Sequence, residues 1–270
     1  MPKSHRAGLP PAGIGHPRVR QYLDIKRNRR SGSDDTLALE GLWVIRHAVD
    51  ALLPIEAVFV CPPLLRRTDG CQLVDTLRAS GTPTLEVSER VLGRMVDRDG
   101  PDGLAAIARW QPACLADFTV GDATSVVVAD GVDLPGNLGT IIRTADGAGA
   151  KGVITTGRRV RLTHPLVVRA SMGTALSMPV ADVDREEALS WLRRHGFSVI
   201  AADPAATVSY RDADYRGRTA IVLGGERDGL APFWRDAAHV LVSIPMLGVA
   251  DSLNVGHAAA LLLYEVLRRR

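Results

Sequence analysis

Three polar signatures in the second half of the chain combine glycines with side chains that could bind or polarise a ligand. They span residues 130–143, 223–230 and 244–254. Each follows an apolar run typical of a strand, and α/β folds bind ligands in loops at the carboxyl ends of strands. Glycines let a flat ligand approach the backbone, and an arginine can stabilise developing negative charge. We therefore expect one composite ligand site built from three loops.

The elements that must position these loops alternate between strands and helices from residue 125 onward. Continuous apolar strands separated by helices favour a mainly parallel sheet covered on both faces, the α/β class. The predicted strands are 126–129, 152–155, 179–181, 197–202, 219–224 and 240–244, and the predicted helices are 138–148, 165–176, one beginning at Asp184, and 252–269.

The first half of the chain predicts a smaller α/β unit. Its expected helices are 17–30, 41–53, 72–79 and 88–95, and its expected strands are 55–61, 84–87 and 104–108. Proline and glycine punctuate the sequence on both sides of this unit. We expect a flexible basic arm at 1–16, a substrate-binding unit at 17–110, a linker at 111–124 and the ligand-binding domain at 125–270.

Positive charge gathers at the N-terminus. Residues 1–30 hold eight lysines and arginines against one acid, so this stretch has a net charge of +7. The whole chain has a net charge of +3, so residues 31–270 sum to −4. Such a segment favours attraction to a phosphate backbone, although a solvated tail is the simpler alternative. The candidate nucleic-acid contacts are Arg18, Arg20, Lys26, Arg27, Arg29 and Arg30.

Composition argues against several other classes. No segment reaches the ~20 apolar residues that span a bilayer, and no apolar signal-peptide region opens the chain. The three cysteines form no CxxC pair, so we expect free thiols, a cytoplasmic location and no metal. Residues 147–152 satisfy GxGxxG, but this stretch joins a predicted helix to a strand, whereas a dinucleotide-binding motif joins a strand to a helix. A nucleotide-dependent oxidoreductase is therefore disfavoured.

Individual residues of the signatures also allow structural roles. Asn137 could cap the helix that we expect from Leu138, and Glu226 could simply occupy a tight turn. Arg143 points away from the inward stripe at 100° per residue, which is usual for a solvated arginine but would also let it reach an anion or a second subunit. The predicted inward stripe is Leu138, Ile141, Ile142, Ala145 and Gly149.

The last predicted helix is apolar on almost every side. Between Val255 and Leu267 only His257 and Glu265 are polar. Such a helix is buried all round, so we expect a subunit interface as well as core packing. Ser252 or Asn254 could cap it.

The three signatures, in this order and spacing, resemble the SpoU family of RNA ribose 2'-O-methyltransferases, of the trefoil-knotted SPOUT superfamily. The resemblance covers residues 125–270, and residues 17–110 more loosely resemble the ribosomal-protein-like α/β domain that precedes many SpoU domains. It implies a homodimer that transfers methyl groups from S-adenosylmethionine to RNA. We expect 23S ribosomal RNA as the target, with a role in antibiotic resistance as one option; transfer RNA is the alternative, and a non-catalytic RNA-binding protein a remote one.

The resemblance also implies roles for single residues. Contacts to the cofactor are expected from Gly224, Ile244 and Leu253, with Ala202, Gly225 and Met246 as further candidates. Arg143 would be the main catalytic residue, because it could stabilise the developing alkoxide or grip a phosphate. The remaining polar positions that match the family's motifs are Asn137, Glu226, Ser252 and Asn254.

Overall fold

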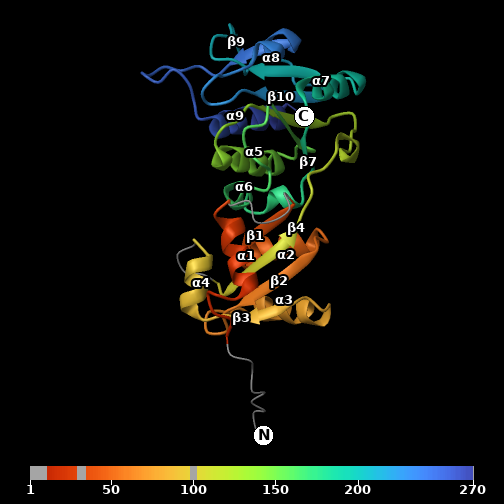
Figure 1. Ribbon diagram of the computed structural model, residues 1–270. Coiled ribbons are helices and arrows are strands. Elements are labelled where there is room, and N and C mark those ends of the chain that lie inside the picture. Colours follow the sequence, from red (N-terminus) through yellow and green to blue (C-terminus); the bar gives the residue numbers. More distant parts are fainter. Residues whose placement is uncertain (1–10, 29–34, 98–101, 270) are drawn as a thin grey trace. The chain divides into compact units, whose positions relative to one another are not determined.

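The computed structural model describes residues 11–28, 35–97 and 102–269, and the chain divides into two compact units, Met1–Trp110 and Gln111–Arg270 (Figure 1). Each unit has its own sheet and core. Arg29, Arg30 and most of the expected arm at 1–16 lie outside the described residues.

The first unit is built on a four-stranded mixed sheet with the order β1-β4-β2-β3. Strand β4 runs antiparallel to both of its neighbours, and β2 and β3 are parallel. Its elements are α1 (Pro17–Lys26), β1 (Thr36–Glu40), α2 (Leu42–Asp50), β2 (Ile55–Val60), α3 (Thr68–Ala79), β3 (Thr84–Glu86), α4 (Glu89–Met95) and β4 (Leu104–Arg109).

Helix α1 belongs to the core of this unit. Val19 and Tyr22 are almost fully buried and join a cluster with Phe59 of β2, Leu92 of α4 and Ile107 of β4. The Tyr22 and Phe59 rings meet edge to face at 5.6 Å. The predicted basic helix is therefore amphipathic, since one side packs on the sheet while Arg20 is exposed on the other.

The second unit is built on a seven-stranded sheet with the order β7-β6-β5-β10-β8-β11-β9, in which every described strand pair is parallel. This confirms the predicted α/β class. Its elements are η1 (Leu115–Asp117), β5 (Ser125–Asp130), α5 (Pro135–Gly147), β6 (Val153–Thr156), α6 (Pro165–Ala170), η2 (Thr174–Leu176), β7 (Val180–Asp182), α7 (Arg185–Arg194), β8 (Ser198–Ala202), β9 (Val208–Ser209), β10 (Thr219–Leu223), α8 (Pro232–Ala237), β11 (Val240–Ser243) and α9 (Val255–Arg268).

Apolar runs explain the centre of this sheet. All residues of β5 and β10 are buried, as expected for parallel strands covered on both faces. On one face, Trp191 of α7 and Trp234 of α8 are buried with Val128 of β5. Leu115 and Phe118, from the segment predicted as a linker, pack into the same cluster.

Several predicted boundaries are wrong. Helix α5 begins at Pro135 with Leu134 as its N-cap, so Asn137 lies inside the first turn and is no cap. Proline is favoured in this first turn because its missing N–H needs no partner there. Gly149 is exposed beyond the end of α5. The helix predicted at 165–176 breaks after Ala170, where Met172 (φ 55°) and Gly173 (φ 85°) adopt left-handed conformations.

Two other predictions about this unit are confirmed. Asn254 is the N-cap of α9, and its side chain accepts from the Gly256 amide at 2.9 Å. Residues 147–152 do join a helix to a strand. Among the helices in the described part of the chain, none has the length and apolar character needed to cross a bilayer.

Candidate functional site

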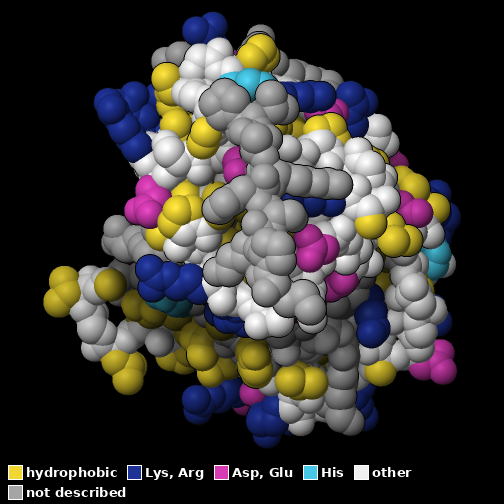
Figure 2. All heavy atoms as spheres, turned by 90° about the horizontal axis from the view of Figure 1, so that it is seen from below, with side chains coloured by type: hydrophobic (Ala, Val, Ile, Leu, Met, Phe, Trp, Pro, Cys, Tyr) yellow, Lys and Arg dark blue, Asp and Glu magenta, His cyan; other side chains and the backbone are white. Residues whose placement is uncertain are grey.

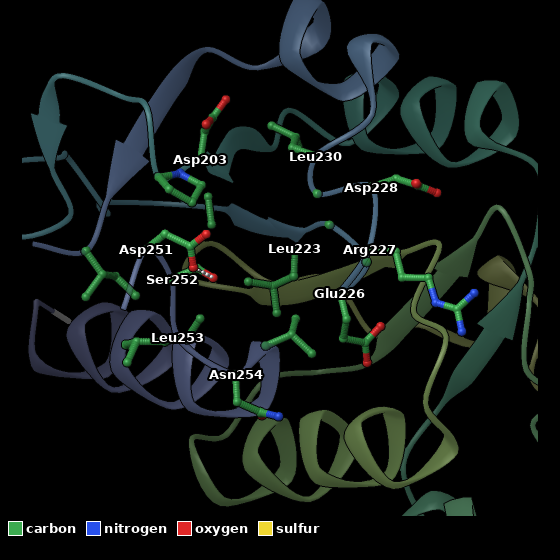
Figure 3. A pocket seen from close by; sticks show the side chains of 18 of the residues that line it. Asp203, Leu223, Glu226, Arg227, Asp228, Leu230, Asp251, Ser252, Leu253 and Asn254 are labelled. Carbon is green, nitrogen blue, oxygen red and sulfur yellow. Dashed lines mark hydrogen bonds between the residues drawn. The ribbon is translucent and has the colours of Figure 1, made fainter. Parts of the chain in front are cut away.

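A cavity of about 700 Å³ lies at the carboxyl edge of the parallel sheet in the second unit. Most of the lining comes from the ends of three neighbouring strands and the segments after them: 202–204 at the end of β8, 223–230 at the end of β10, and Ile244, Met246 and 251–255 after β11. Leu134 and Asn137, from the start of α5, also line the cavity, as do Val242 of β11 and Ala258 of α9. The topology therefore brings all three polar signatures to one place (Figure 3).

One hydrogen-bonded chain connects the three signatures. The Asn137 amide donates to Glu226 Oε1 at 2.5 Å, and its oxygen accepts from Asn254 Nδ2 at 3.1 Å. Figure 3 shows Glu226 and Asn254 pointing toward helix α5. Because Asn254 also caps α9, the network fixes the starts of α5 and α9 relative to the loop after β10.

Glu226 is the acceptor that ends this chain. Its Oε2 accepts from the Asp133 amide at 2.8 Å, and its Oε1 also accepts from the Leu134 amide at 3.4 Å. Partial burial raises the pKa of Glu226, but the hydrogen bonds from the Asp133 amide and Asn137 outweigh it and lower the pKa below its ordinary value. At neutral pH Glu226 is therefore an anion whose oxygens hold the loop.

Two glycines make the loop after β10 possible. A Cβ on Gly224 would lie 2.2 Å from the Gly229 oxygen, and one on Gly225 would lie 2.2 Å from the Gly131 oxygen. The loop folds back on itself, since the Gly229 amide donates to the Gly225 oxygen at 3.0 Å. The wall of the pocket is thus backbone packed against backbone, which leaves peptide groups facing the cavity.

An ion pair between a buried carboxylate and a half-exposed arginine also holds the start of the first signature. The Asp130 carboxylate, 2% exposed at the end of β5, accepts from Arg185 Nε at 2.7 Å and from Thr156 Oγ1 at 2.7 Å. Arg185 is the first residue of α7, which contributes nothing to the pocket lining. Near the cavity, Arg159 bridges Asp133 and Asp228.

The lining of the cavity is strongly acidic. It contains Asp203, Glu226, Asp228 and Asp251 against the single cation Arg227. Asp203 and Asp251 were not predicted as site residues from the sequence. Asp203 could have been found, since it directly follows the strand predicted to end at 202, and strand ends carry ligand-binding residues. It is 5% exposed and pairs with Arg235 at 2.8 Å.

The predicted cofactor residues all line this cavity: Ala202, Gly224, Gly225, Ile244, Met246 and Leu253. Of the predicted catalytic residues, Asn137, Glu226, Ser252 and Asn254 line it as well. Ser252 is exposed, and its hydroxyl donates to Asp251 at 3.1 Å. Within the described residues, no group of three or more His, Cys, Asp or Glu side chains could hold a metal ion.

Arg143 lies apart from the cavity. It is exposed on α5, opposite the buried Ile141 and Ile142, as the helical periodicity predicts. It forms no ion pair with any described residue and does not line the pocket of its own chain. A Cβ on Gly147, one turn further along α5, would be 3.4 Å from the hydroxyl of Tyr264 on α9, so Arg143 and the outer face of α9 share one surface.

The candidate RNA contacts of the first unit fall into two groups. Arg18 and Lys26 are half-buried and paired with acids, Arg18 with Glu56 at 3.3 Å and Lys26 with Asp97 at 2.6 Å. Arg20 and Arg27 are exposed. On the face drawn in Figure 2, Lys and Arg side chains form separate groups with acids among them rather than one continuous patch.

Comparison with known proteins gives a consistent result. The SpoU rRNA methylase family matches residues 124–264, and an MRM3-like substrate binding domain matches residues 16–106. The 23S rRNA (uridine(2479)-2'-O)-methyltransferase of Streptomyces viridochromogenes is 31% identical over 257 residues, which cover 93% of this chain and 88% of that protein. A relative in Staphylococcus haemolyticus, named as a TrmH family tRNA/rRNA methyltransferase, is 38% identical over 148 residues.

The shared length differs between these relatives. The match to the Staphylococcus haemolyticus protein covers 54% of this chain and 59% of that protein, so the chain spans less than two thirds of its length. The crystal structure of an AdoMet-bound rRNA methyltransferase from Sinorhizobium meliloti superposes with a TM-score of 0.85 at 31% identity, covering 95% of this chain and 96% of that one. With the family match extending over more than half of its residues, the chain belongs to the SpoU rRNA methylase family.

Proposed function

We propose that this protein transfers a methyl group from S-adenosylmethionine to a ribose 2'-hydroxyl of RNA. The observation that carries the proposal is the Glu226–Asn137–Asn254 chain, which joins the three family signatures around one cavity. Membership of the SpoU family and the AdoMet-bound Sinorhizobium meliloti structure support it. The cytoplasm, which keeps thiols reduced, suits the free cysteines Cys61, Cys71 and Cys114.

The residues that line the cavity fit this methyl donor. Ile244, Met246 and Leu253 offer apolar surface, and the glycine loop at 224–225 offers peptide groups. The acidic lining favours a ligand that carries a sulfonium and an ammonium group, because opposite charges attract across short distances. The cavity volume lies within the range usual for cofactor sites.

S-adenosylmethionine supplies a methyl group on a positive sulfur, and its transfer forms the bond from the methyl carbon to the ribose oxygen while sulfur keeps the electron pair of the broken C–S bond. The chain must align the two reactants and assist loss of the hydroxyl proton. Alignment can lower the barrier by roughly 7–11 kcal/mol in favourable cases. Ser252 and Asn254 position the hydroxyl and the loops. The proton passes to water or to an RNA phosphate, since a guanidinium stays protonated and is a poor base.

Arg143 stabilises the developing oxygen charge or grips an adjacent phosphate, and it does so in the partner subunit of a homodimer. Its own cavity lies elsewhere, and the surface around it is apolar: Leu261, Tyr264 and Leu267 of α9 are 39%, 52% and 44% exposed. A second copy of the chain that covers this face would bury these three side chains of α9 and bring Arg143 to the cavity of that second copy. The knot implied by the resemblance stays a prediction.

Ribosomal RNA of the large subunit is our first choice of substrate. The Streptomyces viridochromogenes relative, which this chain matches over 88% of its length, is named as a 23S rRNA methyltransferase. Transfer RNA is the second candidate, because the Staphylococcus haemolyticus relative is named for both RNA classes.

Two measurements test this proposal together. Calorimetry should show one molecule of S-adenosylmethionine bound per chain, and mass spectrometry of 23S and transfer RNA incubated with protein and donor should locate one new 2'-O-methyl nucleotide. Methylation of transfer RNA alone would replace the first substrate by the second. If RNA binds but the donor does not, the protein is a non-catalytic member of the fold.

A further inference from the structure

Helix α2 exposes an indole that the fold does not use. Trp43 is 57% exposed, whereas the chain's three other tryptophans are 7% (Trp110), 4% (Trp191) and 0% (Trp234) exposed. Its position on the helix explains this, since the buried residues of α2 are Leu42, Ile45 and Ala48, and Trp43 lies opposite them at 100° per residue. The indole therefore contributes little to the core of the first unit.

One neighbour holds this ring in place. His47, one turn further along α2, meets Trp43 edge to face, with ring centroids 4.8 Å apart and planes at 78°. Such a pair restricts rotation of the indole while more than half of its surface stays in water. An ordered and exposed aromatic surface is what an unpaired RNA base stacks on, because every base has a π face.

Beside Trp43, α2 carries a cation suited to phosphate. Arg46 is on the same helix face, donates to the Asp69 backbone oxygen at 3.1 Å and pairs with the Asp69 carboxylate at 3.7 Å, so the start of α3 lies beside this face. The Arg46 side chain is 41% exposed, and Asp69 also binds Arg67. The nearby acids are Asp50 on α2, Asp69, and Asp102, which accepts from the Leu42 amide.

We propose that Trp43 is a stacking platform for an unpaired base of the substrate RNA, with Arg46 beside it as a phosphate contact. The proposal rests on the proposed function and adds to it a place where the first unit reads RNA. Bases inside an A-form helix are already stacked and cannot reach an indole, so the platform requires a loop, bulge or single strand. Trp43, Arg46 and His47 of helix α2 form a surface that we call the α2 platform.

Fluorescence tests the contact directly, because Trp43 is the only tryptophan of the four that acrylamide can readily reach. Adding oligoadenylate to the full chain should quench the emission and shield it from acrylamide, while duplex RNA of equal length should do neither. In Trp43→Phe the accessible component should be absent. Shielding that depends on protein concentration and not on RNA would assign this face to a second copy of the chain and overturn the proposal.

Methylation kinetics give the second readout. Trp43→Ala should raise KM for the RNA by roughly 10-fold, within the range measured for base–aromatic stacking, and leave kcat and the affinity for S-adenosylmethionine unchanged. Trp43→Phe should restore most of the loss. Arg94→Ala, an exposed arginine of α4, serves as the matched control. If Trp43→Ala methylates RNA normally with an unchanged KM, the α2 platform is refuted and the proposed function stands. If the wild type neither binds the donor nor methylates RNA, the proposed function itself is refuted.

Discussion

The polar groups of the two units are organised in opposite ways. In the second unit, Glu226, Asn137 and Asn254 bind one another, and glycine backbone packs on glycine backbone around the cavity. In the first unit, exposed candidates for RNA contact such as Arg20, Arg27 and Trp43 form no hydrogen bond or ion pair with one another.

The difference reflects what each unit has to do. The methyl transfer that we propose gains most from groups that are already aligned before the substrate arrives, which fits the hydrogen-bonded network of the second unit. Attraction to a phosphate backbone acts over several ångströms and needs no fixed geometry. We therefore expect substitutions in the second unit to remove activity, and single substitutions in the first unit to change affinity by smaller steps.

The largest expected effect comes from removing Arg143 or the pocket residue Asn254. Arg143→Ala and Asn254→Ala should each lose at least about 100-fold in kcat, as for removal of a group that stabilises transition-state charge. If Arg143 acts across the dimer, mixing the two variants rebuilds one intact site in each mixed dimer and should restore roughly a quarter of the wild-type activity. Single-turnover methylation measures this. A mixture as inactive as its components would place Arg143 in its own subunit.

Glu226→Gln should have the next largest effect. The Asp133 amide donates to Oε2 and Asn137 donates to Oε1, and glutamine replaces one of these oxygens by an NH2 group, so one donor loses its acceptor. Loss of a hydrogen bond to a charged group costs about 1.5–3 kcal/mol, which predicts a roughly 10- to 150-fold weaker affinity for S-adenosylmethionine by calorimetry. Glu187→Gln, the same change at an exposed acid of α7 outside the cavity lining, is the control.

The same substitution tests a dependence on pH. Because the pKa of Glu226 is lower in the folded protein than its ordinary value of 4.5, its stabilisation is fully present above that value and disappears as the pH falls through the lowered pKa. Urea unfolding at several pH values should therefore show wild type and Glu226→Gln differing at neutral pH and converging in acid. A constant difference down to strongly acid pH would contradict the carboxylate's role.

A pair of glycine substitutions separates close packing from backbone conformation. A Cβ at Gly225 meets the Gly131 oxygen, and Gly225→Ala should cost about 1–3 kcal/mol and distort the pocket. Gly229 has φ 64° but open space around it, so Gly229→Ala should cost about 1 kcal/mol from conformation alone. Thermal or urea unfolding gives both values. Equal costs would show that the tight contact relaxes freely.

The smallest effects should come from the basic residues of the first unit. Each of Arg20→Ala and Arg27→Ala should lower the slope of log K against log salt by about 0.7–0.9, whereas Arg18→Ala should change it less because Glu56 already pairs with that arginine. Filter binding over a salt series measures this. Deleting residues 1–30 is a poorer test, because it also removes buried Val19 and Tyr22 from the core.

The sequence predicts the central sheet and the pocket well, because apolar strands and loops at strand ends follow simple rules. It misses β1, β9 and α8: β9 and α8 are short, and β1 alternates buried and half-buried residues instead of forming an apolar run. The role of Asn137 shows the deeper limit. Its partners, Glu226 and Asn254, are 89 and 117 residues away along the chain, so local rules offered only a helix cap.

The pair between buried Asp130 and half-exposed Arg185 has a consequence for how this protein fails. Replacing Arg185 would leave the buried Asp130 carboxylate without its cation, which is destabilising, although solvent around the half-exposed arginine makes the cost smaller than for a fully buried pair. Arg185 does not line the cavity, yet the strand that it steadies leads directly into the first signature. Inactivating substitutions found in a random screen should therefore appear at the start of α7 as well as around the pocket, and suppressors of them should restore folding without altering donor affinity.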